Sequence, residues 1–252
     1  MHEDGDFLRS SGKEKVMIQI RPAQERGHFN LGWLDTWHSF SFGDYFAPEH
    51  MGFRSLRVIN EDRVQPGRGF EPHSHKNMEI ISYVLEGAIK HEDSTGTRSI
   101  IHAGEVQKMT AGSGVKHSEY NASTDELAHF LQIWITPDRD GLMPEYEQKS
   151  FSGFKKTNGL SLIASQDGRD GSLTIHQNAD LYAVQFDSSH TMHFPVSKDR
   201  HAWVQVARGE VAFDFLREKR SFGAGDGAAI SEESGFTLSG QKGSEILIFD
   251  LA

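Results

Sequence analysis

Short runs of β-branched and aromatic residues recur along the chain, and turn-forming clusters such as Ser94-Thr95-Gly96 separate them. Few segments show the 3.6-residue period of an amphipathic helix. The pattern predicts strands at Met17–Ile20, Ser55–Ile59, Glu79–Leu85, Leu131–Ile135, Leu181–Phe186, Ala202–Ala207, Val211–Phe215 and Glu245–Leu251. Many short strands with glycine-rich turns indicate an all-β sandwich or barrel.

Two polar segments divide this pattern. Residues 1–16 contain few side chains that could enter a core, so we expect a flexible N-terminal tail there. The segment Pro137–Phe154 is polar, contains two prolines and lies near the middle of the chain. We therefore expect one β-domain over residues 17–140, and a linker followed by a second β-domain over residues 141–252.

An internal repeat supports two domains of one kind. The hexapeptide that starts at Val84 resembles the one that starts at Val206, and each has glycine at its fourth position, Gly87 and Gly209. Further along, Ala103-Gly104 matches Ala224-Gly225, and a glycine follows ten residues later in both copies. The sequence therefore predicts two degenerate copies of one β-fold.

Composition and charge exclude several classes of protein. The 252 residues include no cysteine, which excludes disulfide scaffolds, thiolate metal sites and a cysteine nucleophile. The formal net charge of −10 argues against a general nucleic-acid binder. The longest apolar stretch, Leu127–Ile135, is far shorter than the ~20 residues of a membrane span. We expect a cytoplasmic protein without membrane association, and a monomer.

The candidate chemistry lies in two triplets, His73-Ser74-His75 and His117-Ser118-Glu119. In a strand, residues i and i+2 point to the same face, so each triplet would present two ligand-type side chains together. If the two strands face each other across a barrel, three imidazoles and one carboxylate converge. That donor set suits a divalent metal such as Fe, Ni, Cu, Mn, Co or Zn.

The spacing around these triplets resembles the cupin superfamily. The string Gly67-x5-His73-x-His75-x3-Glu79 resembles the first cupin motif, and Gly114-x2-His117-x3-Asn121 resembles the end of the second, although Gly112 stands where that motif has proline. Counted from the repeat glycines, the second copy has Pro195, Ser197, Leu238 and Gly240 in place of the four ligands. We therefore expect one metal ion per chain, in the N-terminal half.

Further motifs resemble the pirin family, closest to its bacterial quercetin 2,3-dioxygenases. They are Gly32-Trp33-Leu34-Asp35-Thr36-Trp37-His38-Ser39-Phe40-Ser41-Phe42, Pro72-His73-Ser74-His75, His91-x-Asp93-Ser94-x-Gly96 and Ala111-Gly112-Ser113-Gly114-Val115-x-His117-Ser118-Glu119. The resemblance implies a bicupin, with two jelly-roll-like β-barrels packed side by side and few short helices. It implies an N-terminal metal-binding cupin domain over residues 17–140 and a C-terminal cupin domain without metal ligands. Its metal ligands would be His73, His75, His117 and Glu119, with Fe²⁺ as the first choice of metal. The carboxylate role that Glu79 has in typical cupins would pass to Glu119.

The same resemblance implies an activity. A metal-dependent dioxygenase of this family would cleave the central ring of flavonols such as quercetin with dioxygen and release carbon monoxide. Glu119 would act as the catalytic base for the flavonol hydroxyl. The alternative is a pirin-like regulator, in which the bound metal tunes a surface that modulates a transcription factor or a metabolic enzyme. A third option is another small-molecule cupin reaction, such as an isomerisation.

Other residues are weaker candidates. Trp33, Trp37, Phe40 and Phe42 could line an aromatic pocket, but core packing is the simpler expectation. The family resemblance alone places Met51 and Phe53 near the site. His91 and Asp93 precede a turn and are expected to serve it. His176, His190, His193 and His201 lie in or near the second copy and are expected to be surface or structural residues.

Overall fold

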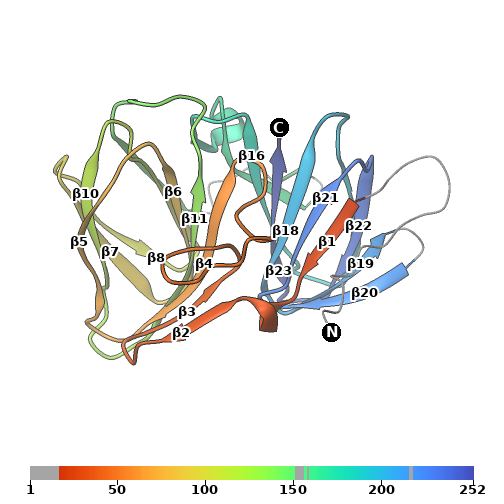
Figure 1. Cartoon of the computed structure of the whole chain (residues 1–252). Helices are drawn as coiled ribbons and strands as arrows, with labels where there is room; N and C mark the ends of the chain where they lie inside the picture. Colours follow the sequence, from red (N-terminus) through yellow and green to blue (C-terminus); the bar gives the residue numbers. More distant parts are fainter. Residues whose placement is uncertain (1–16, 151–155, 158, 216–217) are drawn as a thin grey trace. The chain divides into compact units, whose positions relative to one another are not determined.

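The computed structural model describes residues 17–150, 156–157, 159–215 and 218–252, and strands form almost all of its regular structure (Figure 1). The tail predicted over residues 1–16 lies outside the described residues. The first described strand, β1, spans Met17–Arg21. The helical turns among the described residues are the short 3-10 segments η1 (Ala23–Glu25) and η3 (Arg169–Gly171). None of the helices found there is long or apolar enough to cross a membrane.

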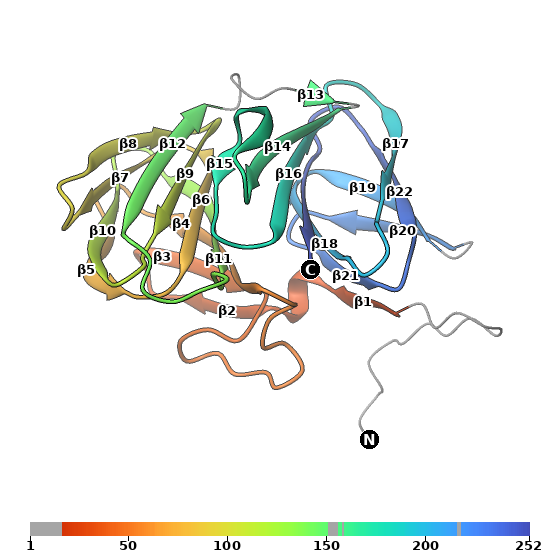
Figure 2. The same ribbon diagram turned by 90° about the horizontal axis from the view of Figure 1, so that it is seen from above.

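Two sheets build the N-terminal barrel. The larger has seven strands in the order β12 (Glu145–Ser150), β9 (Glu105–Thr110), β6 (Glu79–Glu86), β11 (Ala128–Ile135), β4 (Leu56–Val64), β3 (Leu34–His38) and β2 (Gly27–Asn30). The smaller has four, in the order β5 (Gly69–His75), β10 (Val115–Asn121), β7 (Ala88–Asp93) and β8 (Arg98–His102). A long connection between β3 and β4 projects from these strands (Figure 2).

The C-terminal barrel repeats this plan. Its larger sheet runs β1, β21 (Gly227–Ser231), β18 (His201–Arg208), β23 (Glu245–Leu251), β16 (Ala179–Gln185), β14 (Leu160–Ser165) and β13 (Lys156–Thr157), with β15 (Leu173–Thr174) beside β14. Its smaller sheet runs β17 (His190–Pro195), β22 (Gly235–Gly240), β19 (Glu210–Phe215) and β20 (Glu218–Gly223). Apart from β15, the two strand orders correspond one to one, which confirms the predicted all-β fold of two cupin-type domains.

The interiors of the two barrels differ. In the N-terminal barrel, Val84 on β6 and Phe130 on β11 belong to one apolar cluster, while Ile80 and Trp134 on the same two strands belong to another. The middle residue between them on each strand is polar: Ser82 on β6 and Gln132 on β11. In the C-terminal barrel, one large apolar cluster of the described residues includes Val204, Phe213 and Ile248. Within the part of the chain that the structure describes, the N-terminal barrel therefore has a buried polar layer between two apolar clusters, whereas Val204 and Ile248 extend the apolar core through the C-terminal barrel.

The two compact units of the structure do not meet at residue 140, where the sequence analysis placed the border between the domains. Among the described residues, those within Met1–Glu25, Lys156–Leu162 and Ala179–Ala252 form one compact unit, and those within Arg26–Lys155 and Ile163–Asn178 form the other. The first strand of the chain therefore belongs to the C-terminal unit, because β1 pairs with β21. The expected linker contains a strand as well, since β12 pairs with β9 over six residues and completes the edge of the N-terminal sheet.

Candidate metal centre

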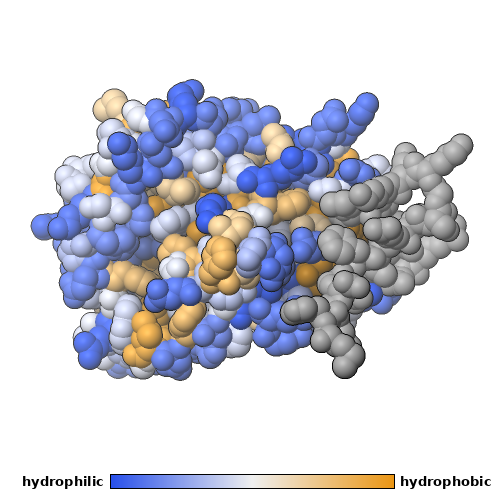
Figure 3. Space-filling view, in the orientation of Figure 1, coloured by the Kyte–Doolittle hydropathy of each residue, from blue (hydrophilic) through white to orange (hydrophobic). Residues whose placement is uncertain are grey.

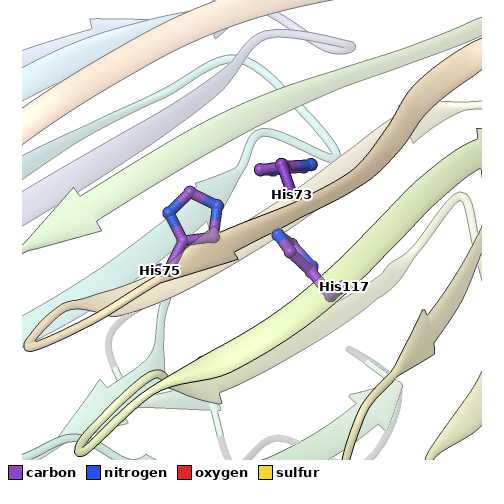
Figure 4. A group of neighbouring side chains, drawn as sticks. All are labelled: His73, His75 and His117. Carbon is purple, nitrogen blue, oxygen red and sulfur yellow. The ribbon is translucent and has the colours of Figure 1, made fainter.

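Three histidines converge on the inner face of the smaller N-terminal sheet. His73 and His75 lie two residues apart on β5, so they share a face. His117 on the neighbouring strand β10 is the direct cross-strand partner of His73. The strands are therefore adjacent in one sheet and do not face each other across the barrel, so the side chains meet by cross-strand pairing. The ring centroids of the three histidines lie 4.6–4.9 Å apart (Figure 4).

The chemistry of this triad fits a metal ion. One ring nitrogen from each of the three histidines lies within 4.8 Å of the others. His117 is 2% exposed, and neither of its ring nitrogens has a hydrogen-bond partner among the described residues. Buried polar atoms normally have a partner, and a metal ion would provide one for a ring nitrogen of His117. The residues present therefore fit the group that the sequence motifs imply.

Burial favours the neutral form of two of these imidazoles, those of His75 and His117. Desolvation, followed by the charges of His117 and His73, lowers the pKa of His75 to about 4. Desolvation and the neighbouring His73 and His91 lower the pKa of His117 to about 3. A neutral imidazole has the free lone pair that metal coordination requires, so His75 and His117 can ligate an ion at pH 7.

Glu119 is buried next to His117, and a cage of polar side chains holds it. Its Oε1 accepts hydrogen bonds from Gln107 Nε2 at 2.6 Å and from Ser82 Oγ at 3.0 Å, and its Oε2 accepts one from Gln132 Nε2 at 2.6 Å. The ligand atoms of Glu119 and His117 group with that of His91, within 4.8 Å of one another. The structure thus brings Glu119 to the site, but in a second group rather than with His73 and His75.

Sequence reasoning missed the three cage residues. They form the polar layer of the barrel, since Ser82 is the cross-strand partner of both Gln107 and Gln132. A signal was available in the repeat, because the residue five positions before Gly87 is Ser82 and the one five before Gly209 is Val204. A polar residue where the other copy is apolar marks a position that packing alone does not explain.

A further buried acid lies in the same barrel. Asp62 on β4 is 3% exposed. Burial raises its pKa to about 7, a hydrogen bond with Thr36 opposes this, and the negative charge of Glu119 adds to it. Asp62 therefore adds less negative charge near Glu119 at neutral pH than an ordinary aspartate would.

His91 and Asp93 have different roles, contrary to the shared turn role expected for them. Asp93 does serve the turn, since its Oδ1 accepts hydrogen bonds from the backbone N–H groups of Thr95 and Thr97. Burial alone would raise the pKa of Asp93, but hydrogen bonds from Thr95, His91 and the backbone lower it to about 2. His91 is 0% exposed, and its ring centroid lies 5.3 Å from that of His117. Its side chain therefore belongs to the candidate site.

Glu79, the ligand of typical cupins, is held away from the site. Its Oε2 accepts a hydrogen bond from Thr110 at 2.9 Å, and its Oε1 lies 3.1 Å from Nδ1 of His176. Burial raises the pKa of Glu79, and the nearby Lys108 opposes this rise. Glu79 and His176 thus form a structural pair, as the implied transfer of the carboxylate role to Glu119 requires.

An aromatic cavity of about 310 Å³ lies beside the triad. Trp134 forms part of its wall, and the Trp134 ring packs edge-on against His75 at 4.8 Å between centroids. Phe42, which also lines the cavity, packs edge-on against Trp134, with 5.2 Å between the ring centroids. The remaining lining comes mostly from the connection between β3 and β4: Ser41, Gly43, Tyr45, Phe46 and Met51, together with Arg57, Val58 and Met78.

The surface near this cavity is unusually apolar. Phe46 is 71% exposed and Met51 is 43% exposed. Figure 3 shows hydrophobic side chains gathered among the mostly hydrophilic surface of the molecule. Of the four aromatic residues for which core packing was expected, Phe42 lines this cavity instead. Phe40 is buried in the core. Trp37 stacks on His28, and Trp33 packs on Phe70.

The second copy has filled the equivalent space with apolar side chains. Pairing register, counted from Gly114 and Gly235, equates His75 with Phe194, His73 with Met192 and His117 with Leu238. These three residues belong to the C-terminal core. The correspondences Pro195 and Ser197 were wrong, because the connection from β17 to β18 is longer than that from β5 to β6. The conclusion that this copy lacks the histidine ligands still holds.

Comparison with known proteins agrees with these features. Residues 19–135 match the Pirin family, and residues 162–251 match the quercetinase C-terminal cupin domain. The chain is 45% identical over 235 residues to the quercetin 2,3-dioxygenase of Escherichia coli K12, which covers 93% of this chain and 99% of that protein.

Solved structures agree as well. The crystal structure of YhhW from Escherichia coli matches with a TM-score of 0.87 and 44% identity, over 94% of this chain and 98% of that one. The bacterial pirin YhhW in complex with nickel(II) matches with a TM-score of 0.86 and 44% identity, over 93% and 99%. A quercetin 2,3-dioxygenase from Acinetobacter baumannii, at 18% identity and a TM-score of 0.74, shares the fold.

Proposed function

The chain belongs to the pirin family, and we propose that it is a metal-dependent dioxygenase that opens the central ring of flavonols such as quercetin. One observation carries the proposal: three imidazoles, that of His117 buried, offer ring nitrogens within 4.8 Å of one another beside a cavity lined by aromatic side chains. The 45% identity to a quercetin 2,3-dioxygenase supports the same reaction.

We propose that one divalent transition metal binds per chain, through His73, His75, His117 and Glu119. The unpartnered, buried nitrogens of His117 support this ligand set. Iron(II) suits these donors, and the relative in complex with nickel(II) supports nickel as well. Glu119 would join the three histidines by turning one carboxylate oxygen toward them while the cage holds the other.

When bound, the metal ion supplies Lewis acidity, which lowers the pKa of a coordinated flavonol hydroxyl. Glu119 accepts the proton of that hydroxyl. Gln107 and Gln132 hold its carboxylate in position from the opposite sheet. Hydrogen bonds from two amides and a hydroxyl compensate the charge of this buried carboxylate.

The aromatic cavity binds and orients the substrate. A flavonol is flat and aromatic, and the rings of Phe42, Tyr45 and Trp134 offer it faces and edges for packing. The contact between Trp134 and His75 connects the cavity wall to the metal ligands. Apolar walls also exclude water from the reacting carbon atoms. Dioxygen then adds to the deprotonated flavonol, the central ring opens, and the carbon that bore the hydroxyl leaves as carbon monoxide.

Turnover of quercetin tests the proposal. Metal-free protein is loaded separately with Fe²⁺, Ni²⁺, Cu²⁺, Mn²⁺ and Co²⁺, and dioxygen consumption is followed with an oxygen electrode. We expect quercetin-dependent consumption with at least one metal and none in the metal-free protein. If no metal supports turnover while the protein still binds the ion, the regulatory alternative replaces the enzyme.

A further inference from the structure

A second set of ligand-type side chains lies deeper in the N-terminal barrel than the histidine triad. His91, His117 and Glu119 each offer a ligand atom within 4.8 Å of the others, and all three residues are buried. By contrast, His73 and His75 in the first set are partly exposed. The two sets share His117, so they define an outer and an inner position in one chamber.

Strand pairing creates the inner set. β7 and β10 are antiparallel neighbours, and His91 is the direct cross-strand partner of Glu119. Directly opposed residues have their Cβ atoms about 4.5–5.5 Å apart, so their side chains reach the same space. His117 lies two residues from Glu119 and thus on the same face. The position is therefore built into the register of the sheet.

Asp93 prepares His91 for a metal. Its Oδ2 lies 3.0 Å from Nε2 of His91, and a carboxylate can only accept, so Nε2 carries the proton. In the neutral ring this leaves the lone pair on Nδ1, which is buried and has no hydrogen-bond partner among the described residues. Metal-ligating histidines characteristically donate their other ring N–H to a carboxylate in this way.

Glu119 is already held at the inner position. Three donors from Ser82, Gln107 and Gln132 fix its carboxylate. Oε1 receives two of these hydrogen bonds and Oε2 receives one, so Oε2 keeps a lone pair for a further interaction. Two imidazoles with one carboxylate form the facial set that holds non-heme iron(II) and leaves coordination positions open.

We propose that His91, His117 and Glu119 form a second, inner metal position, and that one ion occupies either this position or the outer one at His73, His75 and His117, toward which Glu119 turns when the outer one is filled. Occupancy alternates because a neutral imidazole has one lone pair, so His117 can ligate a single ion at a time. The stoichiometry stays at one ion per chain. An ion at the inner position is enclosed by buried residues, and an ion at the outer position lies beside the aromatic cavity.

Nickel binding to variants tests this inference. The full-length protein, His75→Ala, His91→Ala and the double variant are compared by titration with Ni²⁺ alone in competition with a chelator. His75→Ala should still bind one Ni²⁺, and adding His91→Ala should weaken its affinity by about tenfold or more. In the wild-type background, where the outer position remains, His91→Ala should reduce the Ni²⁺ affinity by a smaller factor. An effect below about twofold in the His75→Ala background overturns the inference.

A matched control and a second measurement guard against misfolding. His102→Ala, which removes an exposed histidine of the same sheet, should leave the affinity of His75→Ala unchanged. Circular dichroism reports whether each variant folds. In crystals of the wild-type and His75→Ala proteins grown with Ni²⁺, anomalous scattering should show nickel between His91, His117 and Glu119. No peak there in either protein overturns the inference.

The inference and the proposed function fail separately. A protein that binds nickel in both positions but does not consume dioxygen with quercetin rejects the enzyme and keeps the inner position. If the protein turns over quercetin but its metal affinity does not change when His91 is replaced, the inner position is rejected and the enzyme is kept.

Discussion

Gln132 donates a hydrogen bond from its Nε2 to Oε2 of Glu119 at 2.6 Å, and this contact spans the two sheets of the N-terminal barrel. Gln132 lies on β11 in the larger sheet, whereas Glu119 lies on β10 in the smaller one. The acid that we assign as the base is thus positioned from the wall opposite to the strand that carries it.

Replacing Gln132 by Leu should destabilise the metal-free protein. The carboxylate of Glu119 would lose one donor while it remains buried, and an unsatisfied buried acceptor costs about 1–3 kcal/mol. Urea unfolding followed by fluorescence measures the change. Gln19→Leu is the control, because Gln19 is exposed on β1, and it should stay within about 0.5 kcal/mol of the wild type. Equal effects from the two substitutions would show that the cage contributes nothing to stability.

Replacing Glu119 by Gln should slow quercetin turnover by about 10²–10⁴-fold, the usual contribution of a general base. Glutamine keeps the size of the side chain and an oxygen that can ligate, but it lacks the negative charge and most of the basicity. Because loss of a carboxylate also weakens metal binding, the rate is divided by the metal content of each sample. An unchanged normalised rate removes Glu119 from the role of base.

Replacing His117 by Ala should abolish metal binding, since His117 belongs to both candidate ligand groups. Elemental analysis after loading and desalting gives the metal content per chain. His102→Ala removes an exposed histidine from β8 and should retain one ion. If His117→Ala retains as much metal as His102→Ala, the ion binds elsewhere.

His38 should make the stability of the protein depend on pH. Desolvation lowers its folded pKa from 6.5 to about 4, although a backbone hydrogen bond at Phe42 opposes this. The unfolded chain therefore takes up the proton first, so stability is fully present above about pH 6.5 and is lost as the pH falls toward 4.

Between pH 7 and pH 5 this loss is about 2 kcal/mol for one such group. His38→Gln cannot titrate, so its unfolding free energy should fall by about that much less over the same interval. Urea unfolding at the two pH values measures the difference. An identical pH dependence in the variant and the wild type would contradict the assignment of a buried, neutral His38.

The repeat glycines show how far the sequence predicts this fold. Gly87 and Gly209 have φ angles of 68° and 69°, and Gly104 and Gly225 have φ angles of 85° and 90°. Left-handed backbone of this kind favours glycine, so the turns of both barrels left a trace in the sequence. The bounds of aliphatic strands such as β6 and β18 were predicted to within one residue. Their side chains pack in a core, so the strands consist of runs of apolar residues that are visible in the sequence.

The polar strands show where prediction stops. β5 has an exposed and half-buried pattern with no apolar run, so propensity alone does not reveal it, and only the His-x-His spacing did. The cage of Ser82, Gln107 and Gln132 comes from three strands that are distant in sequence, and its meaning depends on register. In the C-terminal barrel, pairing with Val204 puts Ala228 and Ile248 at the equivalents of Gln107 and Gln132.

The ratio of carbon monoxide released to dioxygen consumed tests the central claim most directly. Quercetin and one molecule of dioxygen together contain the atoms of one ring-opened ester and one molecule of carbon monoxide. Metal-loaded wild-type protein should therefore release one carbon monoxide per dioxygen consumed, and His117→Ala should do neither. Dioxygen consumption without carbon monoxide, or equal turnover by His117→Ala, would contradict a flavonol dioxygenase that works at this metal centre.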